Sequence, residues 1–83
     1  MDILDATYKN DFSIELQFSN NEHRIVNFEP ILKKYAKGEN EKYLLLSNFK
    51  KFKVEVGNIV WGKNWDIILP VNYLYAHGEK VNS

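Results

Sequence analysis

The residue types that most often perform chemistry are scarce in this chain of 83 residues, and they are not spaced for joint action. Cysteine is absent, which excludes disulfides, thiolate zinc sites and cysteine nucleophiles. The two histidines, His23 and His77, form no His-x-x-x-His pair, so we predict no metal site and no base catalysis. We expect His77 at the C-terminal end of a helix, where a cationic ring interacts favourably with the helix dipole.

Ser47 and Asp66 are the other candidates for catalysis. Ser47 lacks the Gly-x-Ser-x-Gly context of a nucleophile elbow, and we expect it to cap a single helical turn. Asp66 stands alone and would make a poor general acid or base, so we expect it to accept turn N–H bonds or to meet Lys63. The four glycines are isolated and form no phosphate-binding loop. We therefore predict a protein that is not an enzyme and that holds no cofactor.

Alternating apolar residues predict three strands in the first third of the chain, at residues 3–8, 13–18 and 24–28. In the first strand, Leu4 is expected on the same half-buried face as Ala6 and Tyr8. A three-residue loop at 20–22 with an asparagine in the left-handed conformation would pair Leu16 with Val26, which keeps apolar side chains opposite one another.

A second hairpin is predicted around Gly57-Asn58, which has the composition of a two-residue loop. This loop pairs Val56 with Ile59 and Val54 with Trp61. All four side chains would then share one buried face.

Two segments that run from a proline to a glycine, 30–38 and 70–78, are predicted to be helices. The element order is therefore β-β-β-α-β-β-α. This order predicts one α+β domain over residues 1–78, with a small antiparallel sheet packed by one or two helices. Residues 79–83 are expected to be a frayed tail.

Four short motifs follow one another along the chain. They are Phe18-Ser19-Asn20-Asn21 at a hairpin turn, Asn27-Phe28-Glu29-Pro30-Ile31-Leu32 at a helix start, Phe52 before Val54-Glu55-Val56, and Trp61, Asn64, Asp66 and Ile67. In this order they resemble the bacterial domain of unknown function family 2442 over roughly residues 3–75. The chain departs from the family pattern at Trp65, where members usually carry a small residue, and at Asn20-Asn21, where Asp-Gly is more usual.

The resemblance implies a small domain without an established activity. It also implies a toxin–antitoxin-like gene arrangement beside another short protein, and hence a partner-binding or regulatory role. Some members are joined to a helix-turn-helix, which we do not expect in 83 residues.

Positive and negative charges balance over the whole chain, but residues 30–53 carry a net charge of +5 and the remainder −5. The lysine-rich segment 33–53 is either a solvated face or a binding surface. Its aromatic and basic residues alternate at 49–53, which makes nucleic-acid binding the alternative function. We expect Phe52 in the core, however, and a single arginine weakens phosphate recognition.

A small protein partner is the favoured ligand, because tryptophan and tyrosine dominate binding hot spots. Trp65 would be an exposed anchor, or else would fold back over the last helix. The candidate partner-binding residues are Trp65, Asp66, Lys63, Tyr43, Lys50, Lys51 and Lys53. The edge strand at 3–8 could pair with a partner or a second copy, so we expect a monomer or a weak homodimer.

No apolar run is long enough to span a membrane, and the acidic N-terminus does not resemble a signal peptide. We therefore expect a cytoplasmic protein that does not interact with membranes.

Overall fold

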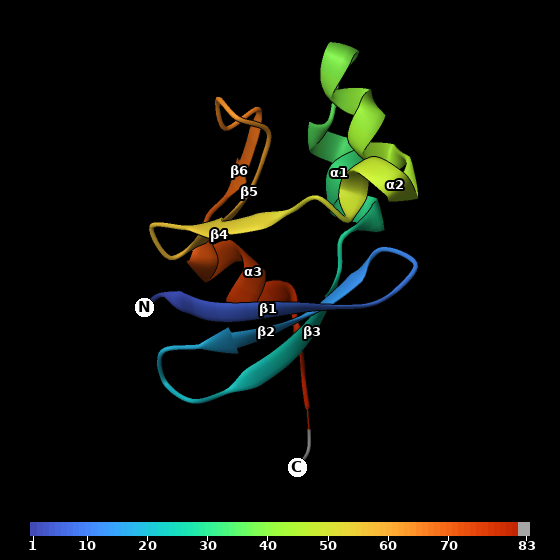
Figure 1. Cartoon of the computed structure of the whole chain (residues 1–83). Coiled ribbons are helices and arrows are strands. Elements are labelled where there is room, and N and C mark those ends of the chain that lie inside the picture. The colour runs from blue at the N-terminus through green and yellow to red at the C-terminus, as the bar shows by residue number, and fades with distance from the viewer. Residues whose placement is uncertain (82–83) are drawn as a thin grey trace.

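The structure is a computed structural model that describes residues 1–81, and within these residues the strands form two antiparallel sheets (Figure 1). Sheet A has the spatial order β1 (Ile3–Asn10), β2 (Ser13–Phe18), β3 (His23–Asn27) and β7 (Glu79–Lys80). Sheet B has the order β4 (Lys53–Glu55), β5 (Asn58–Trp61) and β6 (Ile67–Leu69). The α+β class is confirmed, but two sheets replace the single predicted one.

Three helical segments connect the sheets: α1 (Glu29–Tyr35), the 3₁₀ helix η1 (Gly38–Leu44) and α2 (Leu46–Phe49). The last helix, α3 (Val71–His77), follows β6. Figure 1 shows α3 between the two sheets, with α1, η1 and α2 at one end of them. α3 lies between Pro70 and Gly78 as predicted, whereas α1 ends at Tyr35 because Ala36 leaves the helical conformation and is buried in the core.

The first hairpin has a three-residue loop, but the loop is 19–21 rather than 20–22. Leu16 therefore pairs with Arg24, and Val26 pairs with Ile14. Asn21 adopts the expected left-handed conformation, with φ of 70°. A shift of two residues leaves the same side chains on the buried face, so alternation alone could not distinguish the two registers.

The second hairpin is also displaced by two residues from the predicted register. Val54 pairs with Ile59, and the two loop residues are Val56 and Gly57, with φ of 50° and 77°. Val54, Ile59 and Trp61 share one face as expected, but Val56 is 79% exposed at the tip of the loop. Two positive φ values in succession are typical of a type I′ turn, in which a β-branched residue is strained.

Contacts with segments far apart in the chain favour the observed register of the second hairpin. The N–H of Ile3 donates to the carbonyl oxygen of Gly57 at 2.9 Å, which joins β1 to the hairpin loop. A Cβ atom at Gly57 would lie 2.5 Å from the Asp2 carboxylate, so only glycine fits there. The Oδ1 atom of Asn58 accepts the N–H of Val71 at 3.2 Å and so caps the start of α3.

The first strand contains a bulge that the alternation did not predict. The register of β1 against β2 shifts between Ile3 and Asp5. Ile3 is buried in consequence, and Leu4 is 57% exposed instead of sharing the inner face with Ala6.

The tail expected at 79–83 is wrong for residues 79–81, and 82–83 lie outside the described residues. Glu79–Lys80 is β7, which pairs with β3, and the N–H of Val81 donates to the carbonyl oxygen of His23 at 2.9 Å. The Arg24 guanidinium holds the end of α3 in place by donating to the carbonyl oxygen of Tyr75 at 3.0 Å.

One hydrophobic core lies between the two sheets, and aromatic rings occupy its centre. The indole of Trp61 is fully buried, stacks on Phe49 and contacts Phe28 edge to face. Its Nε1–H donates to the carbonyl oxygen of Phe49 at 2.9 Å. Phe52 is partly buried against the same cluster, so it is not a stacking platform at the surface.

No helix within residues 1–81 is both long and apolar enough to cross a membrane.

Candidate functional site

The loop between β5 and β6, residues 62–66, is the point at which two exposed surfaces meet. Gly62 has a φ of 88°, and a Cβ atom there would lie 2.5 Å from Oδ2 of Asp66. The N–H of Trp65 donates to the carbonyl oxygen of Gly62 at 3.2 Å, and Trp65 itself has a positive φ of 54°. The loop therefore closes tightly, with the Asp66 carboxylate against Gly62.

Asp66 connects this loop to η1. Its Oδ2 atom accepts the hydroxyl of Tyr43 at 3.0 Å and lies 3.7 Å from Nζ of Lys42. Its carbonyl oxygen accepts the side-chain amide of Asn40 at 3.2 Å. These partners, rather than the expected Lys63, give Asp66 a structural role.

Tyr43 was expected to be an exposed anchor, and that expectation is wrong. Only 5% of its surface is exposed, because η1 turns its ring toward Trp61 in the core. Burial, together with the hydrogen bond to the Asp66 carboxylate, raises the pKa of the Tyr43 hydroxyl above its ordinary value.

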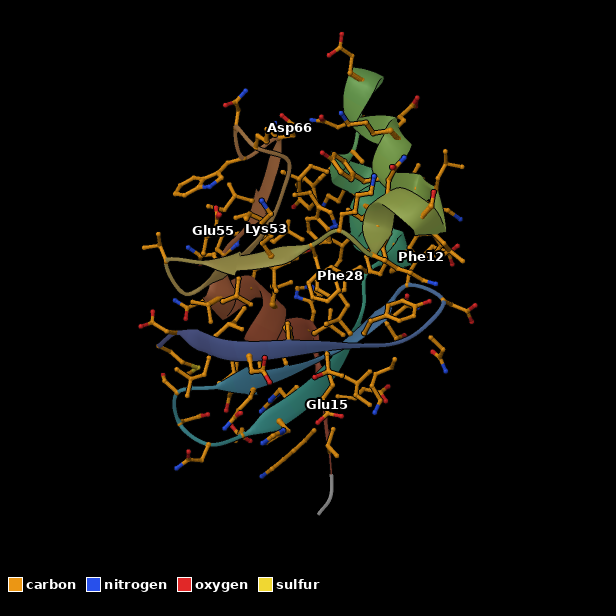
Figure 2. All side chains as sticks on the ribbon, in the orientation of Figure 1. Phe12, Glu15, Phe28, Lys53, Glu55 and Asp66 are labelled. Carbon is orange, nitrogen blue, oxygen red and sulfur yellow. The ribbon has the colours of Figure 1, made fainter. Side chains whose placement is uncertain are left out.

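Trp65 lies across the outer face of sheet B. Its indole N–H donates to the carboxylate of Glu55 on β4, although Trp65 lies two residues before β6, which is the strand at the opposite edge of the sheet. Figure 2 shows Lys53 and Glu55 on the side of β4 that faces away from sheet A. Val60 pairs with Lys53 and shares that outer face, yet it is fully buried. We infer that the indole covers Val60.

A mainly apolar groove of about 480 Å³ runs along β6, and we call it the β6 groove. Its walls include Tyr35 of α1, Trp65, Ile68, Leu69, Pro70 and Tyr73 of α3. Tyr35, Trp65 and Ile68 are each more than 40% exposed. The Trp65 ring is thus both a cover for sheet B and part of an accessible surface, rather than a lid on α3.

A second hollow, of about 250 Å³, lies on the other side of the same loop, and we call it the basic hollow. It is lined by Lys42, Lys51, Lys53 and Lys63, together with Tyr43, Asn48 and Gly62. Within residues 1–81, Lys51, Lys53 and Lys63 have no carboxylate oxygen within 4 Å. The fold therefore brings three of the predicted lysines together.

Lys50 does not belong to this group. Its Nζ lies 4.8 Å from the centre of the Tyr8 ring, over β1 of sheet A. The sequence neighbours Lys50 and Lys51 thus serve different surfaces.

The histidines and Ser47 have structural partners. His77 ends α3 as expected, with its Nδ1 2.8 Å from the carbonyl oxygen of Tyr73, and His23 lies 3.1 Å from Glu15 on the outer face of sheet A. Ser47 lies inside α2 and does not cap it, because the helix begins one residue earlier, after Leu45. Within residues 1–81, no three His, Asp or Glu side chains gather closely enough to hold a metal ion.

Sequence reasoning missed several residues of both surfaces. The sequence places Tyr35 and Tyr73 in predicted helices and predicts no strand at 67–69. It therefore does not predict the groove that these residues form. A signal did exist for β6, because Ile67-Ile68-Leu69 is a short apolar run with two β-branched residues before a proline.

Comparison with known proteins gives one match. A family model described as "Protein of unknown function (DUF2442)" matches residues 3–80. No curated protein and no solved structure matches the sequence.

Proposed function

The chain belongs to the DUF2442 family, and from its own geometry we propose that it is a non-catalytic module that binds an extended segment of a partner protein in the β6 groove. In a toxin–antitoxin-like gene arrangement, the partner would be the small protein encoded by the neighbouring gene.

The observation that carries this proposal is a free strand edge beside exposed aromatic rings. β6 pairs with β5 and is one of the two edge strands of sheet B, the other being β4. An unpaired edge offers backbone N–H and C=O groups to an added strand, and pockets beside it select the side chains of that strand. Trp65 and Tyr35 line the groove, and large rings of these types contribute most to binding energy.

Strand β1, at one edge of sheet A, is less suited to this role. Its register against β2 is interrupted at both ends, between Ile3 and Asp5 and between Tyr8 and Asn10. Bulges of this kind protect an edge from strand addition. β6 pairs with β5 without interruption, so an incoming strand would meet a regular edge.

The first test is a tagged pull-down from native lysate, with and without nuclease, read by mass spectrometry. The proposal expects a small protein that is retained after nuclease treatment. The captured partner is then titrated against Trp65→Ala and Ile68→Glu, which remove a ring from the groove and place a charge in it.

Leu45→Ala is the matched control, because Leu45 is an apolar residue that is 63% exposed outside the groove. We expect the groove variants to weaken binding by about tenfold or more, as loss of a hot-spot residue does, and the control by less than about twofold. Equal binding by all three variants, with unchanged melting temperatures, would rule out the groove. Loss of the partner on nuclease treatment would do the same.

A further inference from the structure

The basic hollow concentrates positive charge that the protein does not neutralise. Four lysines line one concave surface, and the only carboxylate within 4 Å of them in residues 1–81 is Asp66, which is 3.7 Å from Lys42. Lys51, Lys53 and Lys63 come from three different segments: the turn after α2, strand β4 and the β5–β6 loop. Like charges held together in this way repel one another and favour a bound anion.

Hydrogen bonds within the hollow engage its tyrosine and its asparagine, while three of its lysines have no carboxylate partner among the described residues. The hydroxyl of Tyr43 is donated to Asp66, and the side-chain amide of Asn48 donates to the carbonyl oxygen of Lys42 at 2.9 Å. Both groups brace the walls instead of facing a ligand. Recognition in the hollow would therefore depend on charge.

The same walls exclude a base-reading surface. The Tyr43 ring is buried, and no arginine lines the hollow. The hollow therefore lacks both an exposed ring on which a base could stack and the planar fork of arginine, which reads guanine most often. Lysine ammonium groups act instead as point charges on phosphate oxygens.

We propose that the basic hollow is a binding site for closely spaced phosphate groups, recognised without regard to base sequence. These groups could belong to the backbone of a nucleic acid or to a small phosphorylated compound. The site goes beyond the proposed protein-binding function, since none of its lining residues lines the β6 groove. Of the lysine-rich segment 33–53, three lysines line the hollow, Lys42, Lys51 and Lys53, and Lys63 joins them from outside that segment.

The test compares two triple variants that remove the same charge. The hollow variant removes three lysines of the basic hollow, by Lys51→Gln, Lys53→Gln and Lys63→Gln. The α1 variant removes three lysines from α1 and the residues after it, by Lys33→Gln, Lys34→Gln and Lys37→Gln. The probes are inorganic pyrophosphate, followed by calorimetry, and a fluorescein-labelled mixed-sequence 12-nucleotide DNA, followed by anisotropy at low salt.

We expect the hollow variant to lose about tenfold or more in affinity for at least one probe, and the α1 variant to lose less than about threefold. For the single-stranded DNA, the slope of log affinity against log salt should decrease by about 2 in the hollow variant, because three phosphate contacts are lost. Binding of pyrophosphate alone would assign the site to small phosphorylated compounds, and DNA binding that pyrophosphate does not displace would assign it to a nucleic-acid backbone.

Equal losses in the two triple variants would overturn the proposal, because they would show that only net charge matters. Absence of binding to both probes at low salt would overturn it as well. Trp65→Ala should leave binding of both probes unchanged, so failure of this site and failure of the β6 groove can be told apart.

Discussion

Several charged side chains near sheet A are paired with one another, whereas three lysines near sheet B lack a carboxylate partner in the described residues. On sheet A, the Glu22 carboxylate lies 3.4 Å from both Arg24 and Lys80 and accepts the hydroxyl of Tyr75. The Arg24 guanidinium in turn lies 3.8 Å from the centre of the Tyr75 ring. On sheet B, three of the four lysines of the basic hollow, Lys51, Lys53 and Lys63, have no carboxylate oxygen within 4 Å in the described part of the chain.

The edges differ in the same sense. β7 pairs with β3 and is itself a two-residue edge strand of sheet A, while the edge strand β6 of sheet B lies beside exposed rings. Groups that satisfy one another within the fold contribute to stability, whereas groups left unsatisfied at a concave surface are available to a ligand. We therefore expect removal of a charge from the sheet A cluster to cost more stability than removal of a lysine from the basic hollow, which we propose serves binding.

The largest expected effect comes from the residue that joins the two regions. Trp61→Ala removes a fully buried indole that contacts rings from both sides of the core, and we expect a loss of about 3–5 kcal/mol. Since folded domains are stable by only about 5–15 kcal/mol, the variant should be largely unfolded or close to it. Urea denaturation followed by circular dichroism measures the loss.

If the sheets share one core, sheet A must unfold together with sheet B in this variant. Hydrogen exchange tests this expectation. If β2 amides stay protected after β5 amides have lost their protection, the two sheets unfold separately and the expectation is wrong. Trp65→Ala is the matched tryptophan control, and we expect it to cost about 1 kcal/mol because the ring is 45% exposed.

The second prediction compares a paired with an unpaired charge. Arg24→Met leaves Glu22 without its guanidinium and frees the end of α3, so we expect a loss of about 2–3 kcal/mol. Lys51→Met on the basic hollow should change the free energy of unfolding by less than about 0.5 kcal/mol. Similar losses in the two variants would contradict the division between the sheets.

The third prediction compares the two hairpin turns. Val56 has a φ of 50° in a two-residue turn of sheet B, where asparagine is strongly preferred. Val56→Asn should therefore stabilise the protein by about 1 kcal/mol, measured as an increase in melting temperature. The reciprocal change Asn21→Val in the sheet A turn, where φ is 70°, should destabilise it by a similar amount. A destabilising Val56→Asn would show that the tip has another constraint.

The smallest expected effect is a pH dependence that belongs to sheet A alone. Partial desolvation raises the pKa of Glu22, but hydrogen bonds from Asn20 and Lys80 and the charges of Arg24 and Lys80 outweigh it, so the pKa lies below the ordinary value of 4.5. A carboxyl whose pKa is lower in the folded state stabilises the protein above pH 4.5, and this stabilisation is lost as the pH falls through its folded pKa.

Urea titrations between pH 7 and pH 3 measure this dependence. Glu22→Gln should show a weaker decrease in stability with acid than the unchanged protein. The triple variant of the basic hollow should retain the full decrease. A pH profile that Glu22→Gln leaves unaltered would disprove the assignment to Glu22.

Much of the local structure followed from the sequence, because it depends on neighbours along the chain. Alternation identified the inward faces of β2, β3 and the second hairpin, and Pro70 and Gly78 bounded α3. Charge counting found the lysine-rich segment.

Register, burial and grouping depended on the tertiary structure. In both hairpins a shift of two residues preserves the buried face, so the choice fell to distant contacts such as that between Ile3 and Gly57. Tyr43 is buried because η1 packs it against Trp61, and nothing in its immediate sequence indicates that contact.

The separation of Lys50 from Lys51 has the same origin. Both lysines lie in the turn that follows α2, and the way this turn packs places Lys50 over Tyr8 of sheet A and Lys51 in the hollow. Composition and alternation by themselves determined which side chains are apolar and which face they share. Only the packing of segments far apart in the chain decided which charges meet partners and which remain free.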